Sequence, residues 1–509
     1  MHHLPILSNA LAKQHEAALF ADDPSRAEAA MRAAGTQLGA QLADDCHAFI
    51  DEHESPELIL LLGKGNNTGD TLYAAAKFAE FFPDLEVLLV CTWNPDTWSE
   101  AVSRAFKSLQ GSAEITQILD ISSTPEATTE IEKVLTKLQC SIVIDGIFGM
   151  SFRPPLPPHI ISLLQTINNS SSIRLRVAVD IPSGICDSQS NTKTCFRSDL
   201  TYATGILKQC AANAEIENVG RLKMIDLGFF SHPQKPAHLT VLSPKALQRR
   251  PRNPLSDKRT YGHLFIMAGS RKMPGALIMA TQAAIRSGVG LVTVIAPASL
   301  CTVAAVQHPE AMWLPSPETL SGELSIETIE TLRTHLPRAS AILIGPGMGR
   351  NPETFELMQA VIRSGDEIPI ILDADALQTA CLQAMIETQN ARPGSIITPH
   401  AGELHRISQG HSGLQIAKSI NGIVVEKGTR TWIHSTTRST LIPFGNPSLA
   451  RGGSGDILAG LIAGRASTHP EDLEYAACYA TALHGRAADR MAADKGEQHL
   501  ATTDLLNYL

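Results

Sequence analysis

The chain repeats one short pattern along both halves: a continuous apolar run that ends at glycine, aspartate or another polar residue. The runs lie at 58–62, 87–90, 141–144 and 176–179, and then at 264–267, 291–295, 341–344, 370–372, 395–397 and 423–426. Continuous rather than alternating apolar runs are typical of parallel strands that helices cover on both faces. Ligands of such sheets bind at the carboxyl ends of the strands, so the polar residues that follow the runs are the candidate site residues.

Two glycine-rich segments follow this pattern, one in each half. The first is 63–70, Gly-Lys-Gly-Asn-Asn-Thr-Gly-Asp, and the second is 451–456, Arg-Gly-Gly-Ser-Gly-Asp. Each precedes a helix-like stretch, and a helix N-terminus presents unpaired N–H groups and a partial positive charge. Glycines let an anion approach those groups closely. Two such segments predict two nucleotide-handling domains.

The length and the composition indicate two globular domains. A chain of 509 residues is too long for one ordinary core and suggests two domains of roughly 200–260 residues. We place the first at 1–231, a proline-rich and arginine-rich linker at 232–256, and the second at 257–509. Residues 1–55 are expected to be helical, as are 72–82 and 274–287.

Charge and hydropathy exclude several classes of partner. The formal net charge of −9 argues against a nucleic-acid surface, which usually needs a basic face. No apolar run is long enough to cross a bilayer and no signal-peptide pattern opens the chain, so we expect no membrane partner. The nine cysteines form no Cys-x-x-Cys pair, which predicts reduced thiols and a cytoplasmic location.

In the first half, oxygen-bearing side chains follow several strands. Asn67, Asp145 and Ser183 are expected at three strand ends of one sheet, and their oxygens suit an alkali or alkaline-earth ion better than zinc. Asp180 lies beside them in the sequence and can exchange a proton. The alternative for each residue alone is that Asn and Asp merely tolerate turn conformations. Lys208 is, by default, a surface lysine.

In the second half, Asp456 closes the glycine-rich turn at the start of an apolar helix. A carboxylate beside an anion site can activate a hydroxyl for attack on phosphorus, as in small-molecule kinases. The alternative is an N-cap aspartate that stabilises the helix by roughly 1 kcal/mol. Segment 427–431, Lys-Gly-Thr-Arg-Thr, follows a strand and is a candidate for nucleotide contact, and His400 follows another.

The order and spacing of these motifs resemble the bifunctional NAD(P)H-hydrate repair enzymes, an epimerase domain followed by a dehydratase domain. The resemblance covers nearly the whole chain and is carried in the first half by 63–70, 145–149, 180–184 and Lys208, and in the second by 261–263, 273–276, 345–349, 373–377, 398–403, 427–431 and 445–456. It implies an α/β protein with an N-terminal Rossmann-like three-layer domain and a C-terminal ribokinase-like α/β domain.

The resemblance also implies an activity. The first domain would interconvert the R and S forms of hydrated NADH and NADPH (NADHX and NADPHX). The second would dehydrate the S form with ADP or ATP and Mg²⁺, phosphorylating the added hydroxyl before phosphate leaves. We further expect a homo-oligomer of unspecified order.

The residue roles that the resemblance implies fall into four groups. The catalytic residues would be Asp456, Asp180 and Lys208, and potassium would be bound by Asn67, Asp145 and Ser183. The hydrate would contact Asn66, Asn67, Thr68, Gly69, Asp70, Gly149, Arg153, Pro155, Asp180, Ala276, Gly347, Gly349, His400 and Asp456. The nucleotide would contact Lys427, Gly428, Thr429, Arg430, Thr431, Gly453 and Gly455.

The first glycine loop departs from the family pattern, because Thr68 and Thr71 stand where the family usually has glycine. A β-branched residue forced to positive φ costs roughly 1–2 kcal/mol, which predicts a slower epimerase. Two other functions fit the motifs: a ribokinase-fold small-molecule kinase fused to a Rossmann-like domain, and a nucleotide-binding regulatory protein with inactive sites. The fold cannot separate them. A stable phosphorylated product would indicate the kinase, and nucleotide binding without turnover would indicate the regulator.

Overall fold

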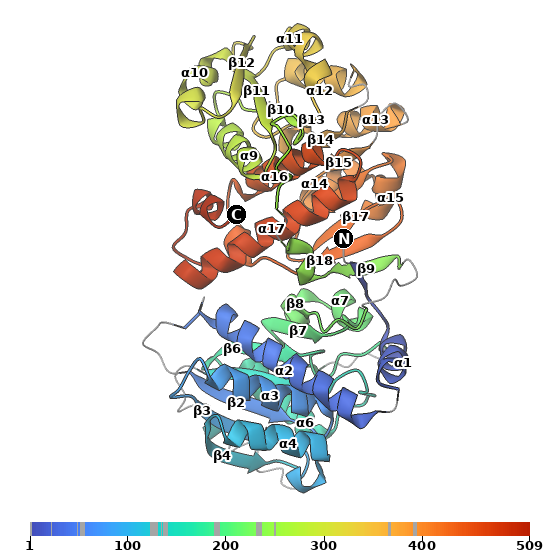
Figure 1. Ribbon diagram of the computed structural model, residues 1–509, viewed down its shortest axis with the longest axis vertical. Helices are drawn as coiled ribbons and strands as arrows, with labels where there is room; N and C mark the ends of the chain where they lie inside the picture. Colours follow the sequence, from blue (N-terminus) through green and yellow to red (C-terminus); the bar gives the residue numbers. More distant parts are fainter. Residues whose placement is uncertain are drawn as a thin grey trace.

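The computed structural model describes the chain except for residues 1–2, 22, 48, 51–55, 123–130, 134, 136–140, 188–193, 231–236, 249–250, 365–367 and 390–393. The described residues form two α/β lobes, drawn one above the other in Figure 1, and each lobe is built on one sheet. Parts of the predicted linker, 232–236 and 249–250, lie outside the described residues.

The first lobe contains a seven-stranded parallel sheet. In spatial order its strands are β4 (Glu114–Asp120), β3 (Glu86–Cys91), β2 (Glu57–Leu62), β5 (Ser141–Gly146), β6 (Ile173–Val179), β7 (Leu200–Thr204) and β8 (Arg221–Ile225). Numbered from β2, this order is 3-2-1-4-5 and onward, the doubly wound Rossmann order. The direction of winding reverses between β2 and β5, where Leu58 pairs with Ile142. The predicted Rossmann-like topology is confirmed, and ligands of this fold bind where the winding reverses.

Helices cover both faces of this sheet, which explains the continuous apolar run in β2. Leu58, Leu60 and Leu62 pack on the face of α2 (Pro24–Cys46), α3 (Asn66–Ala79) and α4 (Glu100–Gln110). Ile59 and Leu61 point to the opposite face and pack with α6 (Pro158–Asn169). The lobe is completed by α1 (Asn9–Phe20), η1 (Pro95–Thr97), α7 (Gln209–Asn213) and α8 (Ile216–Val219).

The second lobe contains an eleven-stranded mixed sheet. In spatial order its strands are β1 (His3–Pro5), β9 (Leu239–Leu242), β18 (Ser439–Ile442), β17 (Thr431–His434), β16 (Ile423–Glu426), β15 (Ser395–Ile397), β14 (Ile370–Leu372), β13 (Ala341–Ile344), β10 (His263–Met267), β11 (Leu291–Pro297) and β12 (Met312–Ser316). The strands from β16 to β12 are parallel and repeat the order of the first lobe, with the winding reversed between β10 and β13.

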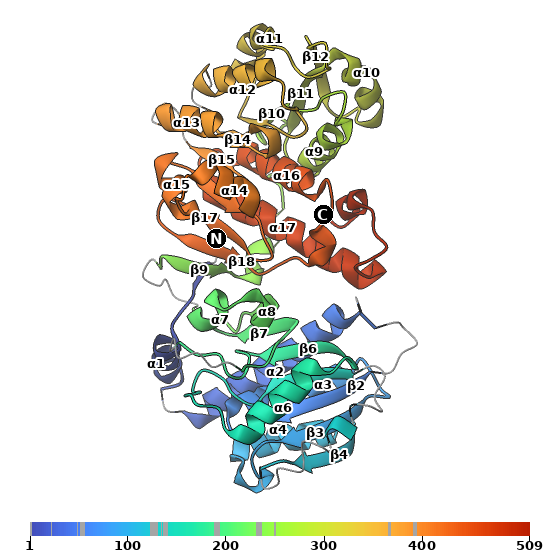
Figure 2. The ribbon, with the colours of Figure 1, turned by 180° about the vertical axis from the view of Figure 1, so that it is seen from behind.

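Helices again cover both faces of the sheet, as Figure 2 shows from behind. The core on one face includes residues of α9 (Pro274–Arg286), α10 (Ala298–Gln307), α16 (Ser454–Thr468) and α17 (Leu473–Lys495). The core on the other includes residues of α11 (Thr328–His335), α12 (Pro352–Ser364), α13 (Thr379–Glu387), α14 (Ala401–Ser408) and α15 (Gly413–Ser419). Short 3-10 helices lie at η2 (Pro244–Leu247), η3 (Leu336–Arg338), η4 (Ala374–Ala376), η6 (Pro447–Leu449) and η7 (Thr502–Asn507).

The N-terminal strand departs from the sequence prediction, which made residues 1–55 helical. β1 forms the edge of the second lobe's sheet, where His3 pairs with Leu242 of β9 in antiparallel register. The label for the N-terminus therefore lies in the upper lobe of Figure 1, while α1 lies beside the lower one. A three-residue strand carries too little periodicity to be recognised in a sequence.

Candidate functional sites

The first site is a cavity of about 600 Å³ at the carboxyl ends of β2, β5, β6 and β7. Most of the predicted substrate residues of the first half line it together with both proposed catalytic residues. These lining residues are Asn66, Asn67, Asp70, Gly149, Arg153, Pro155, Asp180 and Lys208. They come from segments up to 142 residues apart (208 − 66), so the fold brings the predicted set to one place.

Asp180 and Lys208 form a buried ion pair in this cavity. The Lys208 Nζ donates to Asp180 Oδ1 at 2.5 Å, and the lysine side chain is 1% exposed. The expectation of a surface lysine was therefore wrong. Burial disfavours the ammonium, but the charges of Asp180, Glu16 and Asp70 and the hydrogen bond to Asp180 together raise the pKa of Lys208. Asp180 also has a φ of +69°, a region that is costly for residues other than glycine and that clusters at functional sites.

The threonines of the first glycine loop are not strained. α3 begins at Asn66, so Thr68 and Thr71 are helical and neither has a positive φ. Thr68 Oγ1 accepts from Gly63 N and donates to Gly146 O, and Thr71 Oγ1 donates to Asn67 O. The predicted cost of about 1–2 kcal/mol for positive φ at these threonines does not arise. The structure therefore gives no reason to expect a slow epimerase.

Thr68 and Gly69 lie behind the cavity rather than in its wall. Thr68 is fully buried, and its N–H donates to Gly65 O. A Cβ at Gly69 would lie 2.2 Å from Met31 Sδ, so this glycine permits close packing of α2 against α3. Neither Thr68 nor Gly69 lines the cavity, so their contact with the hydrate stays a prediction.

Two of the three predicted ion ligands, Asp145 and Ser183, are hydrogen-bonded to each other, and the third, Asn67, lines the cavity. Asp145 is fully buried and accepts from Ser183 N, Ser183 Oγ and Ile147 N. Burial raises the pKa of Asp145 to about 6, although the bonds from Ser183 oppose the shift. Asn67 is in the first turn of α3, not at a strand end as expected, and its Nδ2 donates to Phe148 O and Val179 O.

This donor set fits a monovalent cation. No ion-pair partner of Asp145 occurs among the described residues, and the Oδ1 of Asn67 is left without a hydrogen bond there. A buried carboxylate without a cationic partner is unfavourable, and hard oxygen donors suit an alkali ion. In the part of the chain that the structure describes, no group of three His, Cys, Asp or Glu side chains forms a site for a transition metal.

The second site lies at the start of α16. Gly453 is the N-cap with a φ of +91°, and a Cβ there would lie 2.3 Å from the Met279 side chain. Asp456 is therefore in the first turn of the helix and is not its N-cap, which removes the capping alternative. Burial, followed by the charge of Asp373, raises the pKa of Asp456 to about 7, while Lys427 lowers it.

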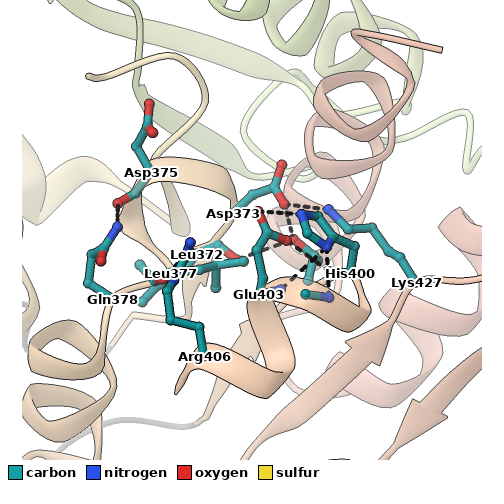
Figure 3. A network of polar contacts seen from close by, with 11 residues as sticks. Leu372, Asp373, Asp375, Leu377, Gln378, His400, Glu403, Arg406 and Lys427 are labelled. Carbon is teal, nitrogen blue, oxygen red and sulfur yellow. Dashed lines mark hydrogen bonds and ion pairs between the residues drawn. The ribbon is translucent and has the colours of Figure 1, made fainter. Parts of the chain in front are cut away.

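Lys427 follows β16 and points toward the same helix start. Its Nζ donates to Asp373 Oδ1 at 2.8 Å, and Thr398 Oγ1 donates to the same oxygen at 2.6 Å. A Cβ at Gly455 would lie 3.5 Å from this Nζ, so the ammonium adjoins the glycine turn. Burial opposes the ammonium, but Asp373 raises the pKa of Lys427 overall. Figure 3 shows Asp373 and Lys427 side by side with His400.

His400 is the N-cap of α14 and belongs to a capping box with Glu403. Its Nδ1 accepts from the N–H groups of Gly402 and Glu403, and Glu403 Oε2 accepts from His400 N. The imidazole is nevertheless 61% exposed, so it can meet a ligand. The strand-like pairing of His400 with Lys427 holds it beside the nucleotide candidate segment.

The remaining predicted hydrate residues lie near the place where the winding of the second sheet reverses. Gly347 has a φ of +60°, and a Cβ there would lie 2.9 Å from the Cβ of Ala276. Gly349 N donates to Asp375 Oδ2 at 2.9 Å. Burial raises the pKa of Asp375 despite this bond. These residues follow β13 or begin α9, so they occupy the ligand-binding edge of the sheet.

Segment 427–431 divides between two surroundings. Gly428 and Thr429 are exposed, and Thr431 Oγ1 donates to Gly428 O. Arg430, predicted to contact the nucleotide, instead donates through Nη1 to Ala212 O of α7 in the first lobe, at 2.8 Å. This bond joins the segment to the first lobe, and the contact of Arg430 with a nucleotide stays a prediction.

The sequence analysis missed three residues of these sites. Asp373 is 2% exposed and holds Lys427, yet a strand-end aspartate alone gives no sign of its partner. Glu16 lines the first cavity from α1, outside every motif. Arg451 donates to the carbonyls of Glu497, Gln498 and Leu500, so it anchors the glycine turn to the C-terminal segment.

Comparison with known families assigns both halves. Residues 264–509 match the family model described as NAD(P)H-hydrate dehydratase, and residues 27–210 match the YjeF-related protein N-terminus. A bifunctional NAD(P)H-hydrate repair enzyme of Vibrio cholerae is 30% identical over 389 residues, 72% of this chain and 74% of the relative. The chain belongs to the bifunctional NAD(P)H-hydrate repair enzyme family. The relative from Moorella thermoacetica is 29% identical over 91% of this chain and 88% of its own length.

Solved structures of relatives match the second lobe. An ADP/ATP-dependent NAD(P)H-hydrate dehydratase from Bacillus subtilis, co-crystallised with ATP and Mg²⁺, is 27% identical. The match covers 52% of this chain and 92% of the Bacillus subtilis chain, with a TM-score of 0.42. A ribokinase-like protein from Enterococcus faecalis is 25% identical with a TM-score of 0.45, and covers 54% of this chain and 95% of its own. Among the described helices of the present chain, none is long and apolar enough to span a membrane.

Proposed function

We propose that this chain repairs hydrated NADH and NADPH by two reactions, epimerisation in the first site and nucleotide-dependent dehydration in the second. The observation that carries the proposal is the arrangement of Asp456, Gly455 and Lys427 at the start of α16. A carboxyl group that titrates near neutral pH lies where a phosphate can be bound by backbone N–H groups and an ammonium. Phosphoryl transfer to a hydroxyl needs both parts.

In the second site, Asp456 takes the proton of the hydrate's hydroxyl as its oxygen attacks the terminal phosphorus of ADP or ATP. The bond to the leaving nucleotide breaks, and Lys427 and the N-terminus of α16 stabilise the charge on the transferring phosphoryl group. Phosphate then leaves with the C–O electron pair while a neighbouring carbon loses a proton, which restores the ring double bond. Gly347, Gly349, Ala276 and His400 would hold the hydrate beside Asp456.

Magnesium would be bound mainly by the phosphates of the nucleotide. Mg²⁺ commonly keeps several waters and takes one or two carboxylates besides substrate phosphates. Asp373 is engaged by Lys427 and Thr398, and Asp375 by Gly349, and no three-carboxylate metal group occurs among the described residues. The residues present therefore fit a phosphate-held ion better than an all-protein site.

In the first site, Asp180 and Lys208 would be catalytic residues that act on the reacting ring, while Asn66, Asp70, Gly149, Arg153 and Pro155 bind the hydrate. Asn67, Asp145 and Ser183 would hold potassium, which would neutralise the buried carboxylate and position the loop that carries Phe148. Trp93 and Phe148 form an aromatic wall of the cavity, with ring centroids 5.5 Å apart, suited to a planar ring of the substrate.

One assay tests both reactions. The full chain is incubated with pure S hydrate and ADP or ATP, and the return of reduced-nicotinamide absorbance is followed. With S hydrate, we expect the absorbance to return. When R hydrate replaces S hydrate, the absorbance should return faster than spontaneous epimerisation allows. Potassium should accelerate only the reaction that starts from R hydrate. Accumulation of a stable phosphorylated product would instead identify a small-molecule kinase, and nucleotide binding without turnover would identify a regulatory protein. The homo-oligomeric state stays a prediction, for light scattering to check.

A further inference from the structure

Helix α1 places one more carboxyl group in the first site. Glu16 lines the same cavity as Asp180, Lys208 and Asp70, although it lies outside the segment 27–210 that matches the N-terminal family model. The helix is joined to the lobe at both ends. Asn9 N donates to Asp187 Oδ2 at 2.5 Å, and the His15 ring stacks on Phe230 with centroids 4.6 Å apart.

The segment before α1 fixes its position relative to the catalytic lysine. Leu7 N donates to Leu207 O and Gln209 N donates to Leu7 O, so Leu7 pairs with the backbone on both sides of Lys208. Two residues earlier, β1 is paired with β9 in the second lobe. The segment that leads to Glu16 is therefore fixed by backbone hydrogen bonds at several points. These bonds hold α1, and with it Glu16, in place at the cavity.

The charges in the cavity leave Glu16 free to titrate. Lys208 is already paired with Asp180, and neither Glu16 nor Asp70 has an ion-pair partner among the described residues. Burial, opposed by Lys208 and reinforced by Asp180, raises the pKa of Glu16 to about 7. Burial, reinforced by the charge of Asp180, raises the pKa of Asp70 well above its usual value. The other charged groups on the cavity wall are Lys64 and Arg153.

Inversion of the hydrate needs a group that can both give and take a proton. The carbon that carries the added hydroxyl adjoins the ring nitrogen, so its C–O bond can break with help from the nitrogen lone pair. The departing oxygen must be protonated, and the water that returns to the other face must lose a proton. A group that titrates near the working pH does this best.

We propose that Glu16 is the catalytic acid of the epimerisation. This inference rests on the proposed function of the first site. The Glu16 carboxyl donates its proton to the hydroxyl oxygen, the C–O bond breaks, water departs with the electron pair, and the nitrogen lone pair forms a C=N⁺ bond. Water then adds from the opposite face, the C=N⁺ bond reverts to a single bond, and the proton that this water loses returns to the Glu16 carboxylate through water in the cavity. Asp180, paired with Lys208, lies in the same cavity and stabilises the cationic ring.

The test uses the full chain without nucleotide, so that only epimerisation occurs. Pure R hydrate is incubated with the wild type, Glu16→Gln, Glu16→Asp and the control Glu86→Gln, an exposed carboxylate at the start of β3. The R and S forms are separated by chromatography between pH 5.5 and 8.5, and the spontaneous rate is subtracted. We expect kcat of Glu16→Gln to fall on the order of 10²-fold with little change in KM. The wild-type decline in rate above pH 7 should be absent in this variant.

Three further outcomes make the test decisive. Glu16→Asp should recover part of the rate and the pH dependence, and Glu86→Gln should match the wild type. All variants should dehydrate S hydrate normally once nucleotide is added, which shows that the chain is folded. A Glu16→Gln rate within twofold of the wild type, with the same pH profile, would overturn the proposal for Glu16. A wild type that does not exceed the spontaneous rate would overturn the epimerase function itself.

Discussion

Replacement of Asp456 by asparagine should abolish dehydration and at the same time stabilise the protein. The loss of activity follows from removal of the base, which typically costs a factor of ~10²–10⁴ in kcat. Nucleotide affinity should change little, because Lys427 and the N–H groups at the start of α16 are kept. The wild-type rate should rise with pH through about 7, since only the ionised carboxylate of Asp456 accepts a proton.

The gain in stability follows from the pKa of Asp456, which the fold raises from 3.8 to about 7. A raised pKa means that the folded state disfavours the carboxylate, so ionisation above pH 3.8 costs stability, increasingly until the folded pKa is passed. Each pKa unit corresponds to about 1.4 kcal/mol, and with partial solvent screening the penalty at pH 8 is on the order of 1–4 kcal/mol. Asparagine removes this penalty, and the gain should be smaller at pH 5.

The assay combines kinetics with urea unfolding of wild type and Asp456→Asn at pH 5 and pH 8. Glu330→Gln, an exposed residue in the first turn of α11, is the matched control and should change neither quantity. Loss of stability by about 1 kcal/mol, with activity kept, would mean that Asp456 only supports the helix dipole. Unchanged turnover alone would refute its assignment as the base.

Two further predictions concern neighbouring features. Asp373→Asn removes the ion-pair partner of the buried Lys427 and the second-largest contribution to the raised pKa of Asp456. Calorimetry should therefore show nucleotide binding that is weaker by about tenfold. The acid limb of the pH profile of dehydration should also move to lower pH. A chain that begins at Leu255 lacks β1 and β9 and leaves the edge of β18 unpaired, so it should melt at a lower temperature and aggregate more than a chain that begins at residue 237. Equal melting temperatures for the two would show that β9 is dispensable.

The central strands of both sheets were predictable because their signal is local. Each run such as 341–344 or 395–397 is apolar throughout, and the observed strands β13 and β15 begin and end at those residues. The position of the site residues followed from the same signal, since polar residues after parallel strands meet at one edge of a sheet. Asn66 and Asp180 accordingly line one cavity.

What the sequence did not reveal depends on partners far away in the chain. Lys208 resembled a surface lysine until Asp180, 28 residues earlier, was found 2.5 Å from its ammonium. Thr68 was expected to be strained because the loop was taken to continue to Asp70, whereas the hydroxyl of Thr68 bonds to Gly63 and Gly146 inside a helix. Neither relation has a periodicity or a spacing from which it could be inferred.

The two lobes, each with one of the two activities, are joined by side-chain contacts as well as by the linker. Lys223 of the first lobe is 4% exposed and lies 3.1 Å from Asp45 of its own lobe and 3.2 Å from Asp489 of α17. Arg430 of segment 427–431 reaches Ala212, four residues after Lys208. Separation of the lobes would break the ion pair of Lys223 with Asp489 and the hydrogen bond of Arg430 to Ala212. Leaving such groups without partners in a buried place is costly. The helix that follows Lys208 is thus held from the second lobe by Arg430, while β1 ties the segment before Glu16 to the same lobe.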